Sequence, residues 1–151
     1  MFTHILVPLD RSEEAARAIE PALSLAEQYH ARITLLTVMF RAPISHAGEG
    51  TFLDQSLEHH GRQYLDEVSA TSIRATSVPV NRVVRLGTAA EGILACAVES
   101  YADLIVISAH GTAGLGSGLG STASTILQEA PCPVLLLRPK SPTGEPGEEA
   151  G

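Results

Sequence analysis

The chain has 151 residues, of which 44% are hydrophobic and 18% are charged, as expected for one soluble globular domain with a full core. Its formal net charge is −7 and its basic residues do not cluster, which makes a nucleic acid an unfavourable partner. Cys96 and Cys132 are too few for a disulfide framework, and neither a membrane-spanning stretch nor a secretory signal is visible, so a cytoplasmic location without membrane association is expected.

The chain opens with a predicted strand followed by a predicted helix. Residues 4–10 form a short apolar run that is typical of a buried strand, and Pro8 suits the end of such a strand because it has no amide proton. Asp10 follows at the carboxyl end of this strand. Ser12 is expected to cap the helix, and Pro21, which lies inside the helical pattern, is expected to kink it.

Strands and helices continue to alternate through the middle of the chain. The pattern predicts a strand over 31–38, a long loop over 40–51, a helix over about 53–73 and a strand over 78–84. Thr88 is expected to cap the next helix. The residues expected to face inward from that helix are Ile93, Leu94, Ala97 and Val98.

The stretch over 103–127 carries the clearest functional signal. An apolar strand leads into a glycine-rich loop and then into a helix. The loop glycines are Gly111, Gly114, Gly116, Gly118 and Gly120, and the apolar stripe of the helix comprises Ala123, Ile126, Leu127 and Ala130. Ser121 or Thr122 is expected to cap the helix, so that bare amides, the helix dipole and hydroxyls form an anion site. In the alternative interpretation the glycines only turn the chain and Ser121 is only a cap.

A last apolar strand is predicted over 133–138, after which the sequence becomes rich in Pro, Gly and Glu. We interpret 1–139 as one domain and 140–151 as a disordered acidic tail. The strand over 134–138 has no successor to cover its edge. Antiparallel pairing with the same strand of a second copy would cover that edge, and the alternative is that the tail covers it.

The alternation of strands with helices indicates an α/β fold, with an open five-stranded parallel sheet and helices on both faces. Ligands of such sheets bind beyond the carboxyl ends of the strands, at the point where the strand order reverses. If the order is 3-2-1-4-5, this crevice lies between the first and fourth strands. Pro8, Leu9 and Asp10 would then line one side of it, and residues 108–121 would line the other.

Several segments resemble the universal stress protein family. They are HILVPLDRSEEAARAI near the start, ARITLLTV, LGTAAEGILACAVESYADLIVISAHG and, most specifically, GSTASTILQEAPCPVLLLRP near the end. The similarity runs from about residue 2 to residue 139. It implies a Rossmann-like sheet of the adenine nucleotide alpha hydrolase type, in the order 3-2-1-4-5. It also implies a homodimer through the strand over 134–138 and a role in the stress response.

One branch of this family binds ATP with the motif G-x-x-G, about nine residues, then G-S or G-T. Carried over to this chain, the first glycine falls on Ser108, the second on Gly111, and the final pair on Gly120 and Ser121. Only eight residues separate Gly111 from Gly120, so the loop is one residue short of the pattern. Ser108 and the shortened loop keep a second interpretation open, a dimeric module of the same family that binds no nucleotide.

The resemblance also implies roles for single residues. Pro8 and Leu9 would line the adenine pocket, and Asp10 would lie at the ribose or adenine edge, although it could instead serve only as a turn acid beside Ser12. Val38 would meet adenine through its backbone, or be simple core. The residues implied at the phosphates are Gly111, Gly114, Gly120, Ser121 and Thr122, with Ser108, His110 and Thr112 beside them. His110 could equally pack at the strand end.

Mg²⁺ is expected only together with the nucleotide, held mainly by phosphates and water near Asp10 or Ser121. The chain has no P-loop lysine and no arginine in the glycine loop, so ATP hydrolysis is expected to be slow or absent. An adenylating enzyme would need an S-G-G-x-D-S type of loop where Asp10-Arg11-Ser12-Glu13 stands, and no G-x-S-x-G elbow supports a hydrolase. We therefore expect a nucleotide-binding regulator with an unknown client protein.

Overall fold

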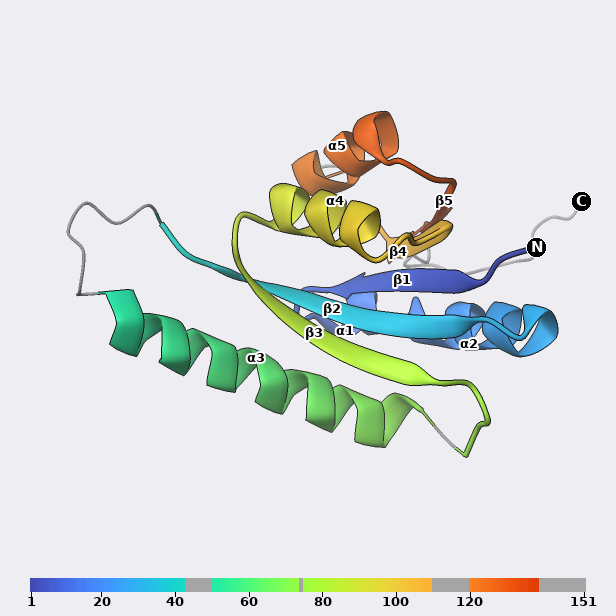
Figure 1. Cartoon of the computed structure of the whole chain (residues 1–151), viewed down its shortest axis with the longest axis horizontal. Coiled ribbons are helices and arrows are strands. Elements are labelled where there is room, and N and C mark those ends of the chain that lie inside the picture. The colour runs from blue at the N-terminus through green and yellow to red at the C-terminus, as the bar shows by residue number, and fades with distance from the viewer. Residues whose placement is uncertain (43–49, 74, 110–119, 139–151) are drawn as a thin grey trace, which may run out of the picture.

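The computed structural model describes residues 1–42, 50–73, 75–109 and 120–138. These residues form one parallel sheet in the order β3-β2-β1-β4-β5, which confirms the predicted fold class and strand order (Figure 1). The strands are β1 (His4–Leu9), β2 (Arg32–Phe40), β3 (Val80–Gly87), β4 (Leu104–Ser108) and β5 (Val134–Leu137). The helices are α1 (Glu13–Ala16), α2 (Ile19–Tyr29), α3 (Gly50–Ser72), α4 (Ala89–Glu99) and α5 (Ser121–Glu129).

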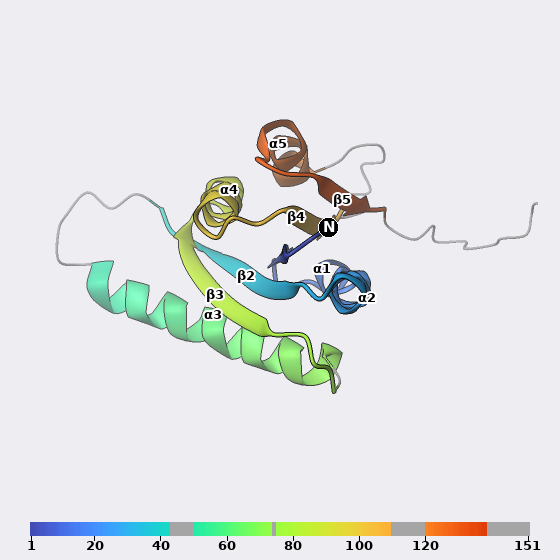
Figure 2. The same ribbon diagram turned by 45° about the vertical axis from the view of Figure 1, so that its right-hand side comes forward.

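The helices divide between the two faces of the sheet, as both views show (Figures 1 and 2). Helices α1, α2 and α3 cover one face and bury residues such as Val7, Leu35 and Leu65. Helices α4 and α5 cover the other face and bury residues such as Leu36, Ile105 and Ile126. Strand β1 is buried along almost its whole length because it lies in the middle of the sheet with helices on both sides.

The strand order reverses between β1 and β4. These strands pair in parallel at Ile5 with Leu104 and at Leu6 with Ile105, and they continue to Leu9 and Ser108 respectively. Their chain connections leave in opposite directions at the carboxyl end, since β2 follows β1 on one side and β5 follows β4 on the other. A crevice at this end is the expected consequence of that topology.

The first predicted helix is broken rather than kinked. Helix α1 ends at Ala16 and α2 begins at Ile19, so that Pro21 is the third residue of α2. A proline ring collides with the carbonyl group four residues earlier, here that of Arg17, if the helix is continuous. The chain avoids that collision by ending one helix and starting another, and Pro21 then lies in a first turn that needs no amide donor from it.

Several predicted boundaries and side-chain directions were wrong. Strand β3 spans Val80–Gly87 rather than 78–84, and α3 begins at Gly50, inside the predicted loop. Val98 is 59% exposed and Leu127 is 41% exposed, so neither faces inward. The buried residues of α4 are Ile93, Cys96 and Ala97, because the sheet meets a stripe that is rotated from the predicted one. Thr88 stands at the N-cap position of α4, but its side chain makes no capping hydrogen bond.

No helix in the described part of the chain is long and apolar enough to cross a membrane. The predicted tail over 140–151 lies outside the described residues.

Candidate functional site

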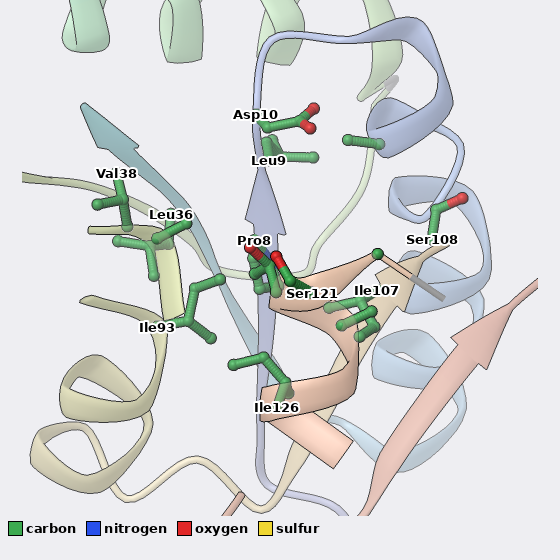
Figure 3. A pocket seen from close by; sticks show the side chains of 15 residues that line it. Pro8, Leu9, Asp10, Leu36, Val38, Ile93, Ile107, Ser108, Ser121 and Ile126 are labelled. Atoms are coloured by element: carbon green, nitrogen blue, oxygen red, sulfur yellow. The ribbon is translucent and has the colours of Figure 1, made fainter. Parts of the chain in front are cut away.

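A pocket of about 460 Å³ opens at the carboxyl ends of β1 and β4, where the strand order reverses (Figure 3). Its walls come from strands β1, β2 and β4 and from helices α1, α4 and α5. The lining residues that the sequence predicted are Pro8, Leu9, Asp10, Val38, Ser108, Gly120, Ser121 and Thr122. The structure thus brings together, around one cavity, residues that are up to 114 positions apart, from Pro8 to Thr122.

Four further candidates, His110, Gly111, Thr112 and Gly114, lie outside the described residues. Seven lining residues were missed by the sequence reasoning: Ala15, Leu36, Ala89, Ile93, Ile107, Ala123 and Ile126. Most of these had the pattern of core residues, and several are buried in the core as well as adjacent to the pocket. Ile107 lies near the carboxyl end of β4, and Ala89 and Ala123 lie in the first turns of α4 and α5, positions that could have indicated the crevice. Leu36, Ile93 and Ile126 lie further inside their elements, where the sequence carries no such signal.

The inner part of the pocket is apolar. Leu36 and Val38 from β2 and Ile93 from α4 form one wall, and Figure 3 shows them on the same side of the cavity. Ile107 from β4 and Ile126 from α5 lie across from them, and Pro8 lies between the two groups. This arrangement leaves a slot lined by hydrocarbon, which suits a flat and weakly polar group such as a heterocyclic base.

Asp10 is held at the rim by a tight turn. Its Oδ1 atom accepts hydrogen bonds from the backbone amide of Ser12 at 3.0 Å and from Ser12 Oγ at 2.6 Å. Ser12 Oγ in turn accepts from the amide of Ala15 at 3.0 Å, which confirms the predicted cap. Asp10 is therefore a turn acid, as the alternative interpretation held, and it lines the pocket as well.

Arg11, which follows Asp10, has a backbone φ of 71°, in the left-handed region that L-residues seldom adopt. Beneath this turn lies Tyr64 of α3, whose hydroxyl is buried. Burial raises the pKa of Tyr64, the nearby charge of Asp10 adds to the increase, and contacts with Arg11 oppose it. The direction of the Asp10 carboxylate is set by its two hydrogen bonds from Ser12, and Tyr64 lies near enough to this turn to feel its charges.

The N-terminus of α5 forms the polar side of the pocket. Its N-cap residue is Gly120, so the prediction that Ser121 or Thr122 caps the helix was wrong. Gly120 has no side chain with which to cap the helix, and the hydrogen bond from the amide of Ser124 to the carbonyl of Gly120, at 3.0 Å, closes the first turn. The first turn of α5, at the positive end of the helix dipole, therefore borders the pocket, and its N-cap residue supplies no side-chain acceptor.

Glycine at position 120 is not required by the described structure. Its φ of −59° and ψ of 159° are accessible to any residue, and a β-carbon added there would meet no atom within 4 Å. Among the described residues, the side of Gly120 where a β-carbon would stand is therefore free of contacts.

Ser108, at the end of β4, carries a further polar group at this site. Its Oγ atom is buried and has no hydrogen-bond partner among the described residues. Buried hydroxyl groups normally have a partner, since leaving one without a hydrogen bond is unfavourable by about 1–3 kcal/mol.

The described cysteines and histidines form neither a reactive thiol site nor a metal site. Burial raises the pKa of the Cys96 thiol, although Arg85 opposes the increase, and burial also raises the pKa of Cys132. No group of three or more His, Cys, Asp and Glu side chains within the described ranges could hold a metal ion. A second groove of about 510 Å³ lies at the amino end of the sheet, between β2, β3 and α4, and includes Arg32, Arg85 and Glu99.

Comparison with known proteins agrees with this fold. The family model described as the universal stress protein family matches residues 1–138. A universal stress protein from Thermus aquaticus, named for its place in the QAH/OAS sulfhydrylase 3′ region, is 36% identical over 140 residues, which covers 91% of this chain and all of that protein. The solved structure of "universal stress protein UspA" from Lactobacillus plantarum is 26% identical with a TM-score of 0.76, covering 91% of this chain and 98% of that one.

Two more distant structures share the fold and are described with ligands. A universal stress protein in complex with cAMP is 21% identical with a TM-score of 0.62, and covers 91% of this chain and 97% of that one. A universal stress protein family protein from Arabidopsis thaliana with AMP bound is 18% identical with a TM-score of 0.61, and covers 97% of each chain. The match of the family model to almost the whole described chain, together with the Thermus relative, shows that this chain belongs to the universal stress protein family.

Proposed function

We propose that this protein binds an adenine nucleotide in the pocket between β1 and β4 and acts as a nucleotide-responsive regulator in the stress response. The observation that carries the proposal is the division of one pocket into an apolar slot and a rim formed by the N-terminus of α5, where Gly120 offers no capping side chain. The apolar slot suits the base of a nucleotide, and the N-terminus of a helix suits its phosphate. The AMP-bound and cAMP-bound members of the family support adenine as the base.

In this arrangement the adenine ring occupies the slot between Val38 and Ile126, and the ribose lies near Asp10. The volume of about 460 Å³ is within the usual range of about 300–1,000 Å³ for small-molecule sites. The first phosphate lies at the amides of α5, with the hydroxyls of Ser121 and Thr122 beside it. Gly111 and Gly114 contact any further phosphates, with His110 and Thr112 nearby.

ATP is the proposed ligand in the cell, with Mg²⁺ as its counterion. The described residues offer few ligands for Mg²⁺. Asp10 is the single carboxylate among the described residues that line the pocket, and no metal-binding cluster occurs in the described ranges. Mg²⁺ would then be held mainly by phosphate oxygens and water, with Asp10 or Ser121 near it. No lysine or arginine lines the pocket in the described part of the chain, so ATP hydrolysis is expected to be slow or absent.

We also propose a homodimer through β5. This strand forms one edge of the sheet, and Leu135 on it is 36% exposed. An open apolar edge is stabilised by pairing with the same strand of a second copy around a two-fold axis. Sedimentation of the wild type and of the Leu135→Arg variant tests this: the wild type should sediment as a dimer and the variant as a folded monomer.

The competing function within the family is a dimeric module that binds no nucleotide, and Ser108 in place of the motif's glycine favours it. Analysis of the purified protein for co-eluting nucleotide, followed by calorimetry with AMP, cAMP and ATP with and without Mg²⁺, separates the two functions. We expect measurable heat and a single site per chain. Absence of both bound nucleotide and heat at about 1 mM ligand, which corresponds to a binding free energy weaker than about −4 kcal/mol, would establish the competing function.

A further inference from the structure

Helix α4 approaches the sheet very closely at Gly92, behind one wall of the pocket. A β-carbon added at Gly92 would lie 2.7 Å from Val38 Cγ2 and 3.0 Å from Val38 Cγ1. Real β-carbons essentially never make contacts shorter than 3.0 Å with other heavy atoms. Glycine is less favourable than alanine inside a helix, so the close approach to Val38 gives a physical reason for glycine at this position.

Val38 contacts Gly92 and also lines the apolar slot (Figure 3). Both of its methyl groups lie against Gly92, so every staggered rotamer of Val38 leaves at least one methyl group facing that residue. A larger residue at position 92 must therefore displace either helix α4 or the Val38 side chain.

Helix α4 is the better anchored of the two. On the turns around Gly92, Ile93, Cys96 and Ala97 are at most 5% exposed, and moving the helix outward would open that part of the core. An ion pair between Arg85 and Glu99 ties the end of α4 to β3, directly beside Val38, whose register partner is Arg85. Val38 borders the open volume of the pocket, so its side chain has space into which it can move.

From these contacts we infer that Gly92 is a positioning residue: it sets the place of the Val38 side chain and thereby the width of the slot that receives the ligand's base. The ligand named in this inference rests on the proposed function, but the effect on the shape of the pocket does not. A methyl group at position 92 pushes Val38 toward the cavity and narrows the slot, without touching the ligand itself.

The chain contains a matched control on the other face of the sheet. Gly61 of α3 packs against β3, and a β-carbon added there would lie 2.7 Å from Val84 Cγ1 and 3.2 Å from Met39 Cγ. The geometry of this contact resembles that of Gly92 with Val38, but Gly61, Val84 and Met39 do not line the pocket. Gly61→Ala therefore reproduces the packing defect without changing the slot.

The first experiment compares Gly92→Ala with Gly61→Ala by thermal unfolding, by AMP calorimetry and by NMR of the valine and isoleucine methyl groups. Both variants should lose thermal stability. Gly92→Ala should shift the Val38 and Ile93 methyl signals of the free protein and weaken AMP binding at least about tenfold, whereas Gly61→Ala should leave the affinity within about twofold of the wild type. Equal losses of affinity in the two variants, or unchanged Val38 signals in Gly92→Ala, would overturn the inference.

The second experiment does not depend on the stability of Gly92→Ala, because it removes the collision. Val38→Ala and the double variant Gly92→Ala with Val38→Ala should bind AMP with affinities within about twofold of each other, since Gly92 acts only through Val38. A double variant that binds much more weakly than Val38→Ala would contradict the inference. If the wild type binds no adenine nucleotide, the proposed function fails, and the methyl signals of the free Gly92→Ala variant still decide the role of Gly92.

Discussion

The two ends of the β1–β4 pair differ in whether their polar groups have hydrogen-bond partners within the protein. At the amino end the carboxylate of Asp103 accepts hydrogen bonds from Thr3 N and Thr3 Oγ1, each at 2.8 Å, and from His4 N at 3.0 Å. The buried His4 ring lies 2.9 Å from the carbonyl of Ser100 and 2.7 Å from Thr34 Oγ1. These groups are satisfied within the protein.

At the carboxyl end the hydroxyl of Ser108 is buried without a partner among the described residues, and the N-cap residue of α5, Gly120, has no side chain that could cap the helix. These groups surround a cavity of about 460 Å³. The Ser108 residue lines this cavity, but its hydroxyl is itself buried, and a buried hydroxyl without a partner is unfavourable. The polar groups of the amino end thus hold the sheet together, whereas those of the carboxyl end border the cavity in which we propose that the ligand binds.

The largest expected effect is a loss of stability at the amino end. Asp103→Asn replaces a carboxylate that accepts three donated hydrogen bonds with an amide that accepts at only one atom, so the free energy of unfolding should fall by about 2 kcal/mol. Asp66→Asn is the control: its carboxylate is 63% exposed, 3.4 Å from Arg82, and its loss should be below about 0.5 kcal/mol. Urea unfolding measures both. If Asp103→Asn also weakened AMP binding, the amino end would contribute to binding as well as to stability, and the proposed difference between the two ends would be wrong.

The pH dependence of Asp103 follows from the same contacts. Burial opposes ionisation, but the hydrogen bonds from His4 and Thr3 together outweigh it and hold the pKa of Asp103 below its usual value. The carboxylate therefore contributes stability above the unfolded-state pKa of about 3.9, and that contribution is lost as the pH falls through the folded-state pKa. The free energy of unfolding of Asp103→Asn, measured at decreasing pH, should therefore lack the part of the acid-induced decrease that protonation of Asp103 causes in the wild type.

The next largest effect concerns Gly120 at the carboxyl end. Gly120→Ala should leave the free energy of unfolding unchanged, or raise it by about 0.5 kcal/mol, because neither the backbone nor packing among the described residues requires glycine there. If the open space at Gly120 belongs to the ligand, the affinity for AMP should fall about tenfold. Calorimetry and thermal unfolding of the same sample measure both quantities. A stable variant with wild-type affinity would exclude contact of the ligand at this point.

A smaller effect of the opposite sign is expected for Ser108. Ser108→Ala removes a buried hydroxyl that has no partner in the described structure, so the ligand-free protein should gain about 1 kcal/mol of stability. The same variant should bind ATP more weakly if the hydroxyl donates to the ligand. Loss of stability in Ser108→Ala would show that the hydroxyl has a partner within the protein and would weaken the comparison.

The smallest effect is a change in the pH dependence of stability at His4. Burial lowers the pKa of His4, and Arg32 adds to the decrease, whereas the hydrogen bond with Ser100 and the charge of Asp103 oppose it. The unfolded chain therefore takes up a proton below pH of about 6.5 that the folded protein resists, so stability falls as the pH decreases through this range. His4→Gln should reduce this slope between about pH 7 and pH 5, as measured by urea unfolding. An unchanged slope would show that His4 is not responsible for it.

The order of elements and the place of the crevice could be predicted because they depend on patterns that are local in sequence. The apolar runs of β1 and β4 and the alternation with helices determine a doubly wound sheet, and the crevice follows from its topology. Asp10 and Ser121 were found because polar residues directly after an apolar strand or before a helix reach the carboxyl edge.

The features that were missed depend on three-dimensional contacts. Ile107 and Ile126 resemble core residues, and only the helix positions show that they also border a cavity. The cap at Gly120 rather than Ser121 depends on where α5 begins, and helix boundaries are poorly determined by propensity. The contact between Gly92 and Val38 depends on the distance between α4 and the sheet, which no pattern in the sequence reports.

The measurement that tests the account most directly is NMR mapping of AMP binding on the wild-type protein. AMP should shift the methyl signals of Val38, Ile107 and Ile126 and the amide signals over 121–123. The signals of His4, Thr34 and Ser100 at the amino end should remain unchanged. Shifts confined to the amino-end groove around Arg32 and Arg85, or no shifts at about 1 mM AMP, would contradict this prediction.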